Sequence, residues 1–315
     1  MKNKQVKRTS KWFLLIRLTG IVLFVVLIFR MDFKEIWSHL KEVKVSFFLL
    51  ALFFQFVLLL IKSYRWHLLK NNYQKPNTLL FDFSIFLESY AIGVVTPGRL
   101  GELVKSGYEE TKKSKWYSAL KILAERGFDL GIFLLIAGYA VLAFSILPLE
   151  RWVAWLIILS AIILILISTV LITRNKLKSK IREIIIKRTK LVRDDTDIDF
   201  NLNRYSLLGV IILSISGNIA TFISCYLLAL GIDMQSSFWF ISGGVSVAGL
   251  LNLLPITIMG IGTREFSFLY IFSSFNQSIV LGFSFLMFLV LQIGGGLLAL
   301  LMGQFFNLWR RKNSV

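Results

Sequence analysis

The sequence has one cysteine, Cys225, and two histidines, His39 and His67, among its 315 residues. A single cysteine excludes an internal disulfide and a cysteine-based metal site, and the two histidines lack metal-ligand spacing. The chain has no His-Glu-x-x-His motif, no P-loop and no arrangement that supports a Ser/His/Asp triad. We therefore expect a protein that is not an enzyme and has no cofactor or bound metal, with Cys225 as an inert buried thiol.

Acidic residues are scarce: 18 Asp and Glu stand against 36 Lys and Arg, and the basic residues cluster between apolar segments. Hydrophobic residues make up 56% of the chain, 28 residues are Phe, and the mean hydropathy is +0.70. This composition exceeds the apolar share of soluble domains and indicates an integral membrane protein. Basic clusters between membrane segments favour anionic lipid as a partner over nucleic acid.

Apolar stretches of spanning length, about 20 residues each, recur along the whole chain. Seven windows meet this criterion: Trp12–Phe29, Ser46–Ile61, Phe128–Leu147, Trp152–Ile172, Leu207–Leu230, Phe238–Leu254 and Phe283–Gln304. The first lacks a small-x-small cleavage site, so we expect a retained helix. With two shorter segments, Leu79–Val95 and Phe266–Phe275, the windows predict one all-α polytopic membrane domain over residues 1–315, with eight or nine membrane segments.

Proline is rare, and two of the four prolines interrupt apolar segments about half a chain apart. Pro97 and Gly101 form the first break; Pro255, Gly260 and Gly262 form the second. Lipid cannot satisfy the backbone groups freed at such breaks, so the breaks must face protein or a water-filled cavity. Paired breaks indicate a transporter-type binding site in broken or re-entrant segments, and their opposite entry into the membrane would fit an inverted repeat.

Lys and Arg in short loops set the orientation of a membrane protein. They are dense at Met1–Lys11, in the loop 174–205 and at Arg310–Lys312. We expect the loop and both termini to lie in the cytoplasm and the protein to lie in the plasma membrane. The loop pattern is typical of a basic helix on anionic headgroups, and Arg30–Lys44 fits an interfacial helix. The run Asp194–Asp199 fits a solvated acidic turn or, alternatively, a metal or nucleotide-sugar site.

Charged residues within or beside apolar segments are costly and are therefore candidates for function. They are Arg99, Glu102, Glu125, Arg126, Asp129, Arg264 and Glu265, with Glu88 as a weaker candidate. Arginine suits bidentate contact with phosphate, and carboxylates suit amines or protons. The set fits a zwitterionic or anionic lipid headgroup. The alternative is that these residues are structural ion pairs that hold the broken helices together.

The spacing of the charged residues predicts which of them form ion pairs. Asp129 lies one turn after Glu125, on the same face of a helix that we expect to open at the residue before Glu125. Arg126 could reach either carboxylate only around that helix. We therefore expect its partner on another segment, at Glu102 or Glu265.

Three motifs connect these residues to a known family. They read Pro-x-Arg-x-Gly-Glu at Pro97, Arg99, Gly101 and Glu102, Glu-Arg-x-x-Asp at Glu125, Arg126 and Asp129, and Pro…Gly-x-Gly-x-Arg-Glu at Pro255, Gly260, Gly262, Arg264 and Glu265. In order and spacing the chain resembles the flippase-like family that shares its fold with the transmembrane region of lysylphosphatidylglycerol synthase. It departs from that family at Gly93 and Val94, where Asn is frequent, and at Lys105, where Arg is common. The resemblance implies movement of phospholipid or polyprenyl-linked lipid between leaflets.

These observations favour a lipid translocase, in which headgroups cross a polar cavity while acyl chains stay in the bilayer. One alternative is a membrane transferase acting on lysyl-tRNA or a lipid-linked sugar, although a largest loop of about 30 residues is too small for a soluble catalytic domain. Another is a non-catalytic partner of a synthase or glycosyltransferase. The expected partners are membrane lipids, above all anionic or zwitterionic phospholipid, and a lipid-modifying enzyme.

Overall fold

The apolar windows of the sequence become long helices in the computed structural model, which describes residues 41, 43–70, 79–108, 112–148, 150–173, 204–251 and 262–313. No strand occurs within these ranges. Five of the described helices are long and apolar enough to cross a membrane: Val45–Lys70, Ser118–Phe144, Arg151–Thr173, Tyr205–Gly231 and Gln277–Trp309. The expected all-α polytopic membrane fold is confirmed.

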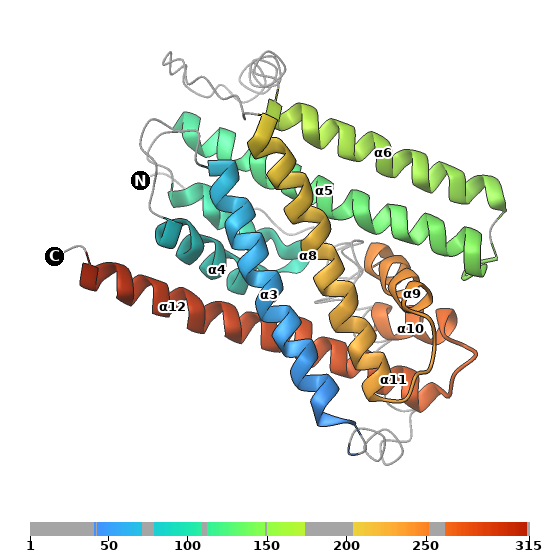
Figure 1. Ribbon diagram of the computed structural model, residues 1–315. Helices are drawn as coiled ribbons and strands as arrows, with labels where there is room; N and C mark the ends of the chain where they lie inside the picture. The colour runs from blue at the N-terminus through green and yellow to red at the C-terminus, as the bar shows by residue number, and fades with distance from the viewer. Residues whose placement is uncertain are drawn as a thin grey trace, which may run out of the picture.

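Helix boundaries follow the predicted windows closely (Figure 1). The described elements are α3 (Val45–Lys70), α4 (Leu79–Val95), the 3₁₀ helix η1 (Pro97–Tyr108), α5 (Lys112–Phe144), α6 (Arg151–Thr173), α8 (Arg204–Gly231), α9 (Phe238–Leu251), α10 (Thr263–Ile271), α11 (Gln277–Met287), the π-helix η2 (Phe288–Gly294) and α12 (Gly295–Asn313). The segment predicted as α4 has the predicted bounds, and α11, η2 and α12 together contain the last predicted window.

The predicted start of the helix that contains Glu125 was wrong. The helix that was expected to open just before Glu125 begins at Lys112 instead, as α5. Leu120, Ala124 and Phe128 lie one turn apart and are all buried, so the packed stripe of this helix continues upstream of the charged residues. Glu125 and its neighbours are therefore held inside a long helix, with packed turns on both sides of them.

The outer surface of the bundle is apolar. On α6 the large side chains Trp152, Trp155, Leu156 and Leu159 are each more than half exposed, whereas the buried positions of this helix are mostly small, such as Ala154. A soluble protein does not expose so long an apolar face. This pattern is what a helix needs when one side meets lipid and the other meets protein.

Small residues allow α5 and α6 to pack closely, side by side along their length (Figure 1). A Cβ at Gly131 would lie 2.5 Å from Ile165 Cγ1, and a Cβ at Gly138 would lie 2.6 Å from Ile158 Cγ1. Such small-residue seams replace the hydrophobic effect as the reason for helix association in lipid. The α5–α6 pair thereby fixes one wall behind the charged residues of α5.

An aromatic cluster joins the helices near the C-terminal half. Three side chains are nearly or fully buried, with ring centroids 5.4 to 6.0 Å apart: Phe268 of α10, Phe272 at the C-cap of α10, and Phe283 of α11. Rings at this separation add favourable quadrupole contacts to their burial. Elsewhere α3 packs along α8, and α12 packs along α4 (Figure 1).

The first break is an antiparallel hairpin of α4 and η1. A Cβ at Gly101 would lie 2.7 Å from the backbone of Ile92, and the hydroxyl of Tyr108 donates to Glu88 at 2.8 Å. The earlier residue of η1 contacts the later residue of α4, and the later residue of η1 contacts the earlier one of α4. The two helices are therefore antiparallel. Thr96 fixes the turn, because its hydroxyl donates to a carbonyl of α4 and accepts from the N–H of Gly101 at 2.8 Å. The chain therefore turns back at the first break as a short hairpin.

Only the end of the second break lies within the residues that the structure describes. Gly262 directly precedes α10. Its φ of 91° is a left-handed backbone conformation that favours glycine. Pro255 and Gly260 lie outside the described residues, as do the predicted first helix Trp12–Phe29 and the interior of the basic loop 174–205. The inverted repeat and the interfacial helices therefore stay predictions.

Candidate functional site

A cavity of about 380 Å³ lies inside the bundle, lined from α3, α4, η1, α5, α8, α9, α10, α11 and η2. Its charged lining residues are Lys62, Arg65, Arg99, Glu102, Glu125, Arg126, Asp129 and Arg264. Apolar side chains complete the wall, among them Leu58, Phe86, Phe133, Phe268, Met287 and Leu291. Of the seven predicted site residues, all except Glu265 line this cavity.

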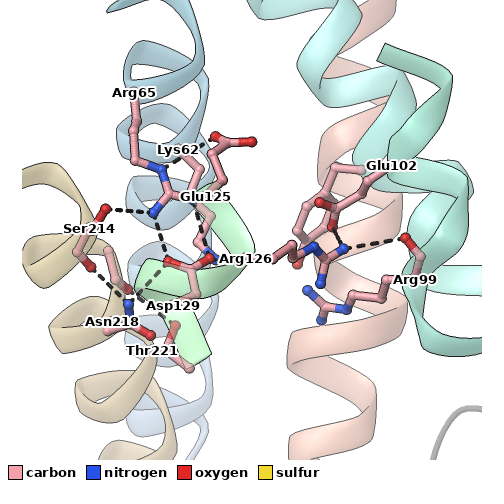
Figure 2. Close-up of polar contacts among 12 residues, drawn as sticks. Lys62, Arg65, Arg99, Glu102, Glu125, Arg126, Asp129, Ser214, Asn218 and Thr221 are labelled. Carbon is pink, nitrogen blue, oxygen red and sulfur yellow. Dashed lines mark hydrogen bonds and ion pairs between the residues drawn. The ribbon is translucent and has the colours of Figure 1, made fainter. Parts of the chain in front are cut away.

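Asp129 is the most heavily coordinated carboxylate in the cavity. It accepts from Lys62 Nζ at 2.9 Å and from both terminal nitrogens of Arg65 at 2.7 and 3.2 Å. Asn218 of α8 adds a contact at 3.3 Å, and Ser214 accepts from Arg65 at 2.9 Å. Figure 2 shows these side chains converging on Asp129 from α3 and α8. The cluster therefore ties three helices together through one carboxylate.

Glu125 lies one turn before Asp129 and is nearly fully buried. Its Oε2 accepts from Lys105 Nζ at 2.7 Å, and its Oε1 lies 3.4 Å from Arg65 Nε. Lys105 itself lies over the rings of Trp66 and Phe86, at 4.6 and 4.8 Å from their centroids. A buried ammonium needs such partners, since burying it alone is costly. Glu125 therefore links η1 to α3 through α5.

Glu102 and Arg126 form the second half of the charged network. Arg126 Nη2 lies 2.8 Å from Glu102 Oε1 and donates to the carbonyl of Arg99 at 3.3 Å (Figure 2). The prediction that Arg126 pairs with another segment, at Glu102 or Glu265, is confirmed for Glu102. Lys105 lies 4.0 Å from the other oxygen of Glu102. The first break and α5 are thus joined by charge as well as by packing.

Arg99 differs from the other cations of the lining. Its backbone is in the left-handed region, with a φ of 54°, which costs a residue with a Cβ about 1–2 kcal/mol. Its guanidinium lies over the ring of Tyr90, 5.4 Å from the centroid, and Tyr90 in turn accepts from Gln55 at 3.0 Å. Among the described residues no carboxylate lies within ion-pair distance of Arg99. It is therefore the cation with the most freedom to bind a ligand.

Arg264 and Glu265 pair with each other at the start of α10. Arg264 Nη2 lies 2.6 Å from Glu265 Oε1, and Ser284 of α11 contacts both side chains at 2.8 Å. The second oxygen of Glu265 accepts from the N–H of Gly262 at 2.7 Å. Glu265 therefore caps its own helix, a position where a carboxylate is favourable, and it is not among the residues that line the cavity beside Arg264.

The sequence interpretation did not include Lys62 and Arg65. Both follow the predicted apolar window, and as flanking cations they resembled an orientation signal. A helical period was the missing clue, because Gln55, Leu58, Lys62 and Arg65 recur at three- and four-residue steps and all line the cavity. The polar residues of α8 carry a similar signal, with Ser214, Asn218 and Thr221 one turn apart inside an apolar window.

The weaker candidate Glu88 lies outside the cavity lining. It accepts from Tyr108 and from Asn307 of α12, so its role is to hold the hairpin against α12. Within the described part of the chain, no group of three His, Cys, Asp or Glu side chains is placed to hold a metal ion. Cys225 is fully buried, as expected.

The charged cavity in an apolar helix bundle is the setting in which the comparison with known families is informative. Residues 15–307 match the family model described as the lysylphosphatidylglycerol synthase TM region. The chain belongs to this family. The match runs through both breaks and through every residue of the charged network. A comparison with curated proteins gives no significant match.

Proposed function

We propose that the protein moves the headgroup of a phospholipid or polyprenyl-linked lipid across the cytoplasmic membrane through this cavity, without making or breaking covalent bonds. The acyl chains would stay in the bilayer, against the apolar outer face of the bundle. In this proposal both termini lie in the cytoplasm, and a lipid-modifying enzyme supplies or consumes the cargo.

The observation that carries the proposal is the open space that the charged residues surround. A cluster of ion pairs with only a structural role would be close-packed. Protein interiors are close-packed, with few voids larger than a water molecule. A space of about 380 Å³ has room for roughly a dozen waters at about 30 Å³ each, and falls within the range of small-ligand sites. Ion pairs that served only to hold helices would need no such room. The family membership, which covers the whole network, supports the same interpretation.

The test is leaflet-resolved transport of labelled phospholipid by the purified protein in liposomes. We expect Arg99→Ala and Arg264→Ala each to reduce the rate about tenfold or more, because a hydrogen bond to a charged group contributes about 1.5–3 kcal/mol and tenfold corresponds to about 1.4 kcal/mol. Arg151→Ala, at an exposed position at the start of α6, is the matched control and should transport normally. Full activity of both cavity variants, at normal expression, would contradict the proposal.

A further inference from the structure

The charged residues that the structure describes around the cavity do not balance. Three carboxylates, Glu102, Glu125 and Asp129, are surrounded by five cations, which are Lys62, Arg65, Arg99, Lys105 and Arg126. Arg264 and Glu265 form a separate pair of their own. The described residues of the site therefore carry an excess of positive charge in a low-dielectric surrounding, which an anion would offset.

Each of the three carboxylates of this network already has at least one cation within 3 Å. Asp129 has Arg65 at 2.7 Å on one oxygen and Lys62 at 2.9 Å on the other. Glu125 has Lys105 2.7 Å from its Oε2, whereas its Oε1 lies 3.4 Å from Arg65 Nε and accepts no hydrogen bond among the described residues. The two oxygens of Glu102 lie 2.8 Å from Arg126 and 4.0 Å from Lys105. A ligand amine entering the cavity would meet cations first and would have to displace one of them.

Arg99 offers the opposite environment. Its backbone is held on both sides, since its N–H donates to the carbonyl of Thr96 at 3.0 Å and its carbonyl accepts from Arg126 at 3.3 Å. The Tyr90 ring supports one face of the guanidinium, which leaves its N–H edge without a carboxylate. A strained backbone conformation that places a cation without a described carboxylate partner in a cavity is the kind of strain found at binding sites. A guanidinium edge matches the geometry of phosphate oxygens.

We infer that this cavity takes an anionic headgroup whose charge is a phosphate, that Arg99 is its phosphate contact, and that headgroups carrying an amine are disfavoured. This inference rests on the proposed function, because it names the cargo of that site. The selectivity follows from two separate facts: each of the three carboxylates already has a cation within 3 Å, and Arg99 has no carboxylate within ion-pair distance among the described residues. Phosphatidylglycerol has the required headgroup, whereas lysylphosphatidylglycerol adds amines to the same phosphate.

The experiment compares these two lipids, with identical acyl chains, in the liposome transport assay. The protein should move phosphatidylglycerol about tenfold faster or more, which corresponds to about 1.4 kcal/mol of discrimination. Arg99→Gly should abolish this preference while the thermal midpoint stays the same or rises, because glycine removes the left-handed strain. Arg99→Lys should keep part of the preference, and Arg151→Gln should keep all of it. Equal or faster transport of lysylphosphatidylglycerol, or a retained preference in Arg99→Gly, would overturn the inference.

A binding measurement separates this inference from translocation itself. The thermal midpoint of the purified protein in detergent is measured with phosphatidylglycerol, with lysylphosphatidylglycerol and with inorganic phosphate, since bound ligand raises stability. We expect the first to raise the midpoint most, and the increase to vanish in Arg99→Gly. If no lipid is transported but this order holds, translocation is wrong and the selectivity stands. If inorganic phosphate acts as strongly as the lipid, the ligand is a free anion and the inference is wrong.

Discussion

Two glycines of the same 3₁₀ helix should respond in opposite ways to one added methyl group. At Gly101 a Cβ would lie 2.7 Å from the backbone carbon and oxygen of Ile92, closer than real Cβ contacts allow. At Gly107 a Cβ would meet no atom within 4 Å. The first site is the closest approach of η1 to α4, and the second is exposed. Alanine at the two positions is therefore a matched pair that differs only in this contact.

The expected magnitudes follow from the geometry. Overpacking costs about 1–3 kcal/mol, and the upper end applies at Gly101 because backbone atoms cannot rotate away. Replacing glycine in a helix gains about 0.5–1 kcal/mol at either site. We therefore expect Gly101→Ala to lower the free energy of unfolding by about 2 kcal/mol, and Gly107→Ala to raise it by about 0.5–1 kcal/mol. Glu102 would shift with its neighbour, so transport should fall in Gly101→Ala as well.

Denaturant titration of both variants in the same detergent gives the difference directly. That difference isolates the overpacking contribution, about 3 kcal/mol, because the helix-propensity gain is common to both. Equal stability of the two variants would refute the hairpin geometry at its closest contact. Reduced transport in Gly107→Ala would show that the backbone of η1, and not the packing against Ile92, limits activity.

Two further predictions test the ion network and the orientation. Asp129→Asn should lower the free energy of unfolding by about 3–5 kcal/mol, because it leaves buried cations underpaired. Asp233→Asn should lower it by less than about 1 kcal/mol, because its partner Lys44 is exposed. Similar losses for the two variants in a denaturant titration would contradict the buried network. In a Cys225→Ser background, Lys178→Cys should react with an impermeant thiol reagent only from the cytoplasmic side, and labelling from outside intact cells would overturn the predicted topology.

The sequence was informative wherever one local property decided the outcome. Hydrophobic run length fixed the helices, because lipid forces a spanning segment to satisfy its own backbone. The cost of charge in such segments likewise selected six of the eight charged residues that line the cavity. The local sequence pattern was less reliable for the start of α5. This helix continues about three turns upstream of Glu125, and side chains there, such as Leu120, are buried.

Lys62 and Arg65 show the limit of that approach. At the end of an apolar window, a cation that orients the chain and a cation that turns into the bundle have the same sequence pattern. Only the packing of α3 and α5 against α8 decides which occurs, by placing Asp129 within 2.9 Å of both. Glu265 shows the converse, because its motif position resembled a site residue and its carboxylate caps α10 instead.

The sequence by itself thus determined a polytopic all-α membrane protein, its family resemblance and the set of charged residues at its breaks, because hydropathy and motif spacing are written along the chain. The tertiary structure decided which of those charges neutralise one another. Pairing depends on distances between residues as far apart as Arg65 and Asp129, and no periodicity encodes them. That Arg99 is left without a carboxylate partner among the described residues, over the ring of Tyr90, follows from the fold alone.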